Sequence, residues 1–275
     1  MTVPIHTLTA AVLFAEPPSL ESLYGVIAGG ALATRAAQMA ERSVRAELDA
    51  GLVEVSLFGA MWPDDDEESL AELGGPSSGL FPGALARAGA QDVLWPEGAS
   101  AAAAHRAFAV LRMIEATGSV RAQLEALEKL SVALLAHPGS LAVFFPAGEA
   151  LRDGNVIGRI RAMSREQDAL PLQIWVNGRL ADAGMGVRVA DLVGLSQFDQ
   201  ADQEAVFPDR AEFHPFEVLG FLLDVTHHLF SEGGALEDGV VYDGPGGVRW
   251  RAALGHDAQI APPRRVVRWI PLSKE

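Results

Sequence analysis

Cysteine is absent from this chain of 275 residues. Without thiols the protein forms no disulfides and no iron–sulfur cluster, and it uses no cysteine nucleophile or zinc ribbon. Lysine is nearly as scarce, since Lys129 and Lys274 are the only two and arginine supplies the rest of the 21 basic residues. No apolar run approaches the roughly 18 residues of a membrane-spanning helix. The first residues also lack the basic region of a signal peptide, so we expect a cytoplasmic protein that does not bind membranes.

Positive charge is in short supply as well. The chain has 36 acidic residues, a net charge of −15 and an isoelectric point near 4.8. A phosphate backbone would be repelled, so nucleic acid is not an expected partner. The hydrophobic fraction of 49% and the mean hydropathy of +0.17 are too high for a disordered chain. The composition therefore predicts a globular protein with a sizeable core.

Strand and helix patterns alternate along the first half. We predict helices after the Ser19 cap, over 32–48 and over 100–136 with a break at 117–119, and strands at 7–14, 52–58, 92–95 and 141–145. Within 120–134, leucines recur every three or four residues, which predicts a helix packed on a sheet. This alternation predicts an α+β fold with α/β layering, in which helices flank a mixed sheet.

The helix that ends at His137-Pro138-Gly139 suggests a division into two packed halves, 1–137 and 138–275. VLWPEG at 93–98 and VFFPAG at 143–148 resemble each other, which leaves open whether the halves arose by duplication. In the second half we predict strands at 170–176 and 187–195, a helix from Pro215 to Gly233, a hairpin over 240–254 and an edge strand at 265–271.

The strongest chemical candidate is a cluster on the helix that begins at Pro215. Asp224 precedes His227 and His228 by three and four residues, so all three can meet on one helix surface. Imidazole and carboxylate ligands suit zinc or iron, which would make the protein a metal-dependent hydrolase. The alternative is that the histidines complement the dipole at the helix end, and the HExxH pattern is absent.

Other catalytic signatures are missing. The chain has no SxxK set, no phosphate-binding lysine and no dinucleotide fingerprint. We therefore expect no cofactor, and a binding protein is favoured over an enzyme. The acidic run Asp64, Asp65, Asp66, Glu67 and Glu68 lacks calcium-loop spacing. It is a solvated loop, the negative first turn of a helix over 69–73, or a surface that steers a basic partner.

The second half resembles a family of bacterial proteins that end in domain of unknown function 4261. The segments that carry the resemblance are HPGSLAVFFPAGEAL, LPLQIWVNGRL, DLVGLSQFDQADQEAV and LFSEGGALEDGVVYDG. Gly194, Leu195 and Phe198 match the family's Gly-Leu-x-x-Phe-Gly-x-x-Glu pattern, whereas Asp199 replaces the second glycine and Glu204 stands later than the usual acid. Asp238-Gly239 matches a closing turn in which Val240-Val241 replaces Asp-Thr.

This resemblance supplies no catalytic residues, because the family has none established. By analogy, some such domains accompany secreted toxins as immunity or adaptor proteins. We therefore expect a non-enzymatic cytoplasmic protein, immunity-like or adaptor-like, that engages a basic toxin or effector through Asp64 to Glu68. The oligomeric state stays open.

Overall fold

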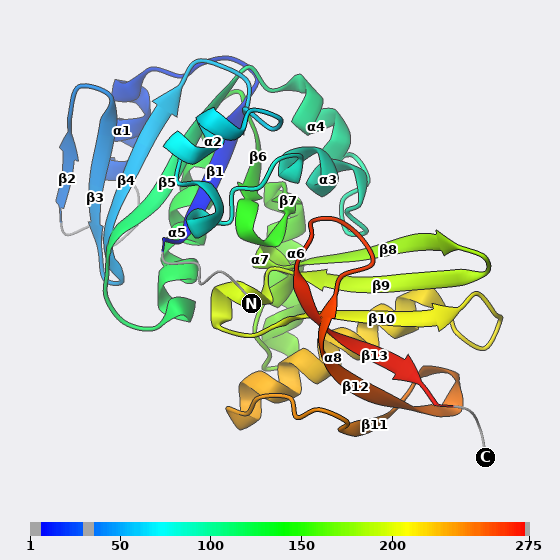
Figure 1. Ribbon diagram of the computed structural model, residues 1–275. Helices are drawn as coiled ribbons and strands as arrows, with labels where there is room; N and C mark the ends of the chain where they lie inside the picture. The colour runs from blue at the N-terminus through cyan, green and yellow to red at the C-terminus, as the bar shows by residue number, and fades with distance from the viewer. Residues whose placement is uncertain (1–6, 30–35, 273–275) are drawn as a thin grey trace.

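The computed structural model describes residues 7–29 and 36–272, which form an α+β fold with two sheets (Figure 1). The first sheet has the order β2-β3-β4-β5-β1-β6-β7 and consists of β1 (Thr9–Phe14), β2 (Ala36–Met39), β3 (Ser43–Leu48), β4 (Gly51–Phe58), β5 (Ala107–Ala116), β6 (Ser140–Phe145) and β7 (Ala150–Arg152). All of its neighbouring strands are antiparallel.

The second sheet has the order β11-β12-β13-β10-β9-β8. Its strands are β8 (Asn177–Gly184), β9 (Val187–Val193), β10 (Asp202–Pro208), β11 (Val241–Gly244), β12 (Val248–Asp257) and β13 (Arg265–Pro271). β10 and β13 are parallel, which makes this sheet mixed. β13 therefore lies inside the sheet, and the prediction of an edge strand at 265–271 was wrong.

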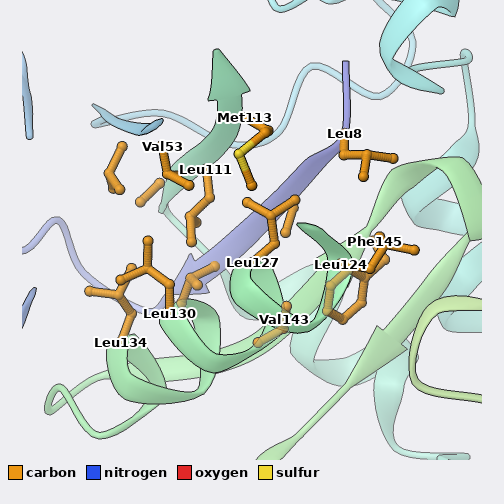
Figure 2. Packing of buried hydrophobic residues seen from close by; sticks show 14 of the residues in the cluster. Leu8, Val53, Leu111, Met113, Leu124, Leu127, Leu130, Leu134, Val143 and Phe145 are labelled. Carbon is orange, nitrogen blue, oxygen red and sulfur yellow. The ribbon is translucent and has the colours of Figure 1, made fainter. Parts of the chain in front are cut away.

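Helices cover both faces of the first sheet. The helices of the fold are α1 (Leu20–Gly29), α2 (Glu67–Glu72), α3 (Ala84–Ala90), α4 (Gly98–Ala104), α5 (Val120–Leu135), α6 (Gly154–Glu166), α7 (Leu172–Trp175) and α8 (Pro215–Glu232). α1 and α5 pack on one face, where the leucine stripe of α5 meets strand side chains such as Leu111 and Val143 (Figure 2). α2, α3 and α4 pack on the other face over β1, β5 and β6.

α8 covers one face of the second sheet. Its buried side chains pack against Trp250 of β12 and Trp269 of β13, both of which have no exposed surface. Leu229 ends this packed stripe, and Gly233 terminates the helix in the left-handed conformation. The prediction of a helix from Pro215 to Gly233 is confirmed.

Several predicted elements are wrong. The helix expected over 32–48 is replaced, within the described residues, by the hairpin of β2 and β3. Residues 107–116 form β5 instead of continuing a helix, and residues 172–175 form one helical turn instead of a strand. No strand forms at 92–95, so VLWPEG and VFFPAG differ in structure.

The chain passes from the first sheet to the second within the second predicted half. Because β6 and β7 pair with the first sheet, the change from one sheet to the other lies between Arg152 and Asn177. The domain division at residue 138 stays a prediction. Within the described ranges, no helix has both the length and the apolar character needed to cross a membrane.

Candidate functional site

The proposed metal ligands share the C-terminal half of α8. Asp224 and His228 are exposed, and His227 is half-buried, with a pKa that burial lowers despite the opposing charge of Asp224. Nowhere in residues 7–29 and 36–272 do three acidic or histidine side chains form a group that could hold a metal ion. The metal hypothesis stays a prediction, and metal analysis of protein purified without a chelator or a histidine tag tests it.

Two members of the acidic run are anchored to helices. Asp64 accepts hydrogen bonds from the backbone N–H groups of Leu85 (2.8 Å) and Ala86 (2.9 Å) at the start of α3. Asp66 caps α2 by accepting from the backbone of Glu68 and Ser69, and the Ser69 hydroxyl, together with these backbone bonds, lowers the pKa of Asp66. These carboxylates are therefore structural caps as well as surface charges.

The three other acids of the run, Asp65, Glu67 and Glu68, are exposed. Their backbone is held between two capped helix starts, so the carboxylates are presented from a fixed segment. Met61, just before the run, is 51% exposed.

His105 fastens the chain that leads into the acidic run. Its Nε2 accepts a hydrogen bond from the Trp62 N–H (2.7 Å), and its Nδ1 contacts the Ala102 carbonyl oxygen. This pairing requires a neutral imidazole with the proton on Nδ1. Burial lowers the pKa of His105 below its usual value of 6.5, because a charged ring would lose hydration and oppose the Trp62 donor.

Replacing His105 with glutamine is expected to flatten the pH dependence of stability between roughly pH 5 and 7. In the wild type the unfolded chain binds a proton more readily than the folded protein, so stability falls as pH decreases from 6.5 through the lowered pKa. Glutamine can accept from Trp62 and donate to Ala102 without titrating. Urea unfolding across this pH range measures the difference. Exposed His214→Gln is the control, and an unchanged profile in His105→Gln contradicts this role.

Among the described residues, the largest constellation of buried charge lies between the two sheets. We call it the ionic network: Arg87 of α3, Glu149 after the 3₁₀ turn η2 (Pro146–Gly148), Arg179 of β8, Asp191 of β9, Asp202 and Glu204 of β10, Arg264 before β13 and Arg268 of β13. It contains four carboxylates and four guanidinium groups and is formally neutral.

A continuous chain of contacts runs through six of these residues. The Arg87 Nε lies 3.0 Å from both Glu149 carboxylate oxygens, and Arg179 Nη1 lies 2.8 Å from Glu149 Oε2. Arg179 also pairs with Asp191, which pairs in turn with Arg264. The Arg264 Nε then donates to Asp202 Oδ2 at 2.7 Å. This chain joins α3 and η2 of the first sheet's layer to three strands of the second sheet.

The strand register aligns the remaining pair with the chain. Arg179, Asp191, Glu204 and Arg268 are successive neighbours across β8, β9, β10 and β13. Arg268 Nε lies 2.9 Å from Glu204 Oε1, and the Gln259 N–H donates to Glu204 Oε2 at 2.6 Å. The network therefore covers the face of the second sheet opposite α8.

Desolvation dominates the electrostatics of the network. Burial raises the pKa of Glu149, Asp202 and Glu204, although neighbouring arginines oppose the effect. For Arg264, burial alone would lower the pKa, but the carboxylates of Asp191 and Asp202 raise it overall. Each carboxylate is engaged by an arginine, so the arrangement suits fixing the two sheets together better than acid–base chemistry.

A second buried pair reinforces this junction. Arg152 of β7 and Asp92 are both fully buried and in contact. The Arg152 Nε also donates to the Gln173 carbonyl oxygen at 2.9 Å, which ties β7 to α7. Burial raises the pKa of Asp92 and lowers that of Arg152.

Sequence reasoning did not find the ionic network. The available signal was a charged residue inside an apolar strand, as with Asp191 in VRVADLV, because a charge buried among apolar residues requires a partner. The partners come from residues far apart in the chain, which the sequence pattern does not pair.

Among the comparisons with known proteins, only the comparison with family models gives a match. No curated protein and no solved structure matches the chain. One family model matches over residues 191–270, within the half of the chain where the sequence resemblance lies. This segment contains five members of the ionic network: Asp191, Asp202, Glu204, Arg264 and Arg268. Residues 191–270 match the model of a family that is described as Domain of unknown function (DUF4261).

Proposed function

We propose that the protein is a non-enzymatic binding protein that engages a basic protein partner through an acidic surface. The observation that carries this proposal is the distribution of charge. Because the ionic network is formally neutral, the net charge of −15 is carried by the rest of the chain. A surface with such an excess attracts basic proteins and speeds their association.

The acidic run supports a specific location for this surface. Asp65, Glu67 and Glu68 project from a segment that Asp64 and Asp66 anchor to two helices. A fixed backbone lowers the entropy lost on binding. The exposed Met61 beside these acids adds an apolar contact, which methionine often supplies at binding surfaces.

Further exposed acids lie on the first sheet, against which the end of α2 packs. The Arg112 guanidinium of β5 donates to the Leu73 carbonyl oxygen after α2 at 2.7 Å, which places the end of α2 beside the sheet. Across β3, β4 and β5, exposed Glu47 and Glu115 flank Leu52 in one cross-strand row. An immunity-like or adaptor role, which the resemblance suggests, would use this surface to cover a basic toxin or effector.

Charge reversal tests the proposal. The triple variant Asp65→Lys, Glu67→Lys, Glu68→Lys is expected to weaken partner recovery by about tenfold or more, because it replaces attraction with repulsion. The measurement is a pull-down from host lysate at low and high salt, with co-purifying proteins identified by mass spectrometry. Recovery of one stoichiometric basic protein that decreases with salt is the expected wild-type result.

A matched control reverses three exposed acids elsewhere, Glu21, Glu166 and Glu237. This variant has the same net charge as the test variant but keeps the acidic run. Equal loss in both variants would show that net charge alone governs binding, and no specific partner at either salt concentration would contradict the proposal.

A further inference from the structure

A hollow of about 290 Å³ lies between α5 and α6. Four basic side chains line it: Arg121 and Lys129 of α5, and Arg161 and Arg165 of α6. In a chain with 36 acidic and 21 basic residues, such a concentration of bases runs against the overall charge. Lys129 is also one of two lysines in the sequence.

Arg161 is held in place by a buried carboxylate. Its Nε donates to Glu128 Oε1 at 2.5 Å, and Glu128 is 1% exposed. Because this bond uses Nε, the four Nη–H donors of the guanidinium lie outside it. An arginine oriented by a fixed carboxylate has lost much of its rotamer freedom before a ligand arrives.

The balance of bases and acids in the lining indicates how much negative charge a ligand of the hollow would carry. Arg121 pairs with Glu125 at 2.8 Å, and Asp168 also lines the hollow. Lys129 and Arg165 are exposed. With four bases and three acids, the lining has a small positive excess, which favours one anionic group over a polyanion.

We propose that this hollow binds the phosphoryl group of a small ligand. A phosphoryl dianion offers several acceptor oxygens, which guanidinium and ammonium donors recognise through charge-assisted hydrogen bonds. The hydroxyl-bearing Ser164 lines the hollow, and Ala169 and Pro171 provide an apolar wall for an organic group attached to the phosphate. This site is separate from the acidic run and does not depend on the proposed function.

Isothermal titration calorimetry with inorganic phosphate and with phenyl phosphate tests the site on the full chain at low salt. Both probes are expected to bind, and tighter binding of phenyl phosphate would identify an organic monoester as the ligand type. Tighter binding of inorganic phosphate would instead identify free phosphate. The double variant Lys129→Ala, Arg165→Ala is expected to weaken binding about tenfold or more, because two charge-assisted contacts are lost.

The matched control is Arg159→Ala, Arg210→Ala, which removes two exposed bases that do not line the hollow. It is expected to bind the probes as the wild type does. The absence of binding by either probe, or equal weakening in the two double variants, would overturn the proposal. Both variants change exposed residues, so thermal unfolding should give nearly wild-type stability for each.

Discussion

Replacing Arg179 with leucine is expected to lower the free energy of unfolding by about 3–5 kcal/mol. The Arg179 guanidinium lies between Glu149 and Asp191, and all three side chains are almost completely buried. Leucine leaves both carboxylates in a desolvated site with one arginine partner fewer, and burial already raises the pKa of Glu149. Urea unfolding at neutral pH, followed by circular dichroism, measures the change.

Arg265→Leu is the matched control, because Arg265 pairs with Asp257 at 2.9 Å on the surface, where the two side chains are 49% and 87% exposed. An exposed pair contributes at most about 1 kcal/mol. A similar small loss in Arg179→Leu would contradict a stabilising role for the network. The double variant Arg179→Leu, Asp191→Asn should recover part of the stability, since Glu149 then keeps Arg87, Arg264 keeps Asp202 and the network is again neutral.

The ionic network extends beyond residues 191–270, the segment that the family model matches. Residues 191–270 include Asp191 but exclude Arg179 and Glu149, to which Asp191 is linked. The segment also excludes β8, the strand that pairs with β9 along the edge of the second sheet. In this chain the matched residues therefore depend on contacts from outside the segment to neutralise buried charge.

The sequence predicted those elements in which the hydrophobic periodicity and the residues at the boundaries indicate the same structure. The α8 pattern has apolar residues at helical spacing between Pro215 and Gly233, and both boundary residues act as expected. The β11–β12 hairpin follows from the dense turn residues at 243–247 between alternating segments. The leucine stripe of α5 packs on the first sheet, as its spacing predicts.

The errors arise where helix propensity and tertiary packing disagree. Residues 43–48, SVRAEL, contain good helix formers, but Val44, Ala46 and Leu48 alternate with exposed Arg45 and Glu47. That period of two was the correct signal, and the neighbouring alanines outweighed it in the prediction. β5 is harder to predict, because its first five residues are buried on both faces and show no alternation.

The candidate site likewise has one part that the sequence predicts, the acidic run, and one part that it does not, the ionic network. The acidic run is visible in the sequence because its charges are contiguous, although the anchoring role of Asp64 depends on α3, about 20 residues away. The ionic network joins Arg87 to Glu149 and Asp191 to Arg264 over much longer separations. Local periodicity carries no information about such pairs, so they become apparent only when the sheets are assembled.

Gly194→Ala is the second substitution with a large expected effect, about 3 kcal/mol or more of lost stability. Gly194 precedes the 3₁₀ turn η3 (Leu195–Phe198) and has a φ of 110°, which residues other than glycine rarely adopt. A Cβ atom there would lie 2.5 Å from the Gly148 Cα, a backbone atom that cannot rotate away. The substitution would also displace the Gly194 N–H, which donates to Asp202 Oδ1 at 2.9 Å.

Gly158→Ala in α6 is the matched control, because nothing lies within 4 Å of a Cβ at that position and the backbone is helical. It is expected to raise stability by about 0.5–1 kcal/mol, since alanine favours a helix over glycine. Opposite signs for the same chemical change would show that Gly194 is needed for close approach of η3 to η2. A neutral Gly194→Ala would instead mean that this part of the junction can shift while Asp202 keeps the Leu195 N–H and Arg264 as donors.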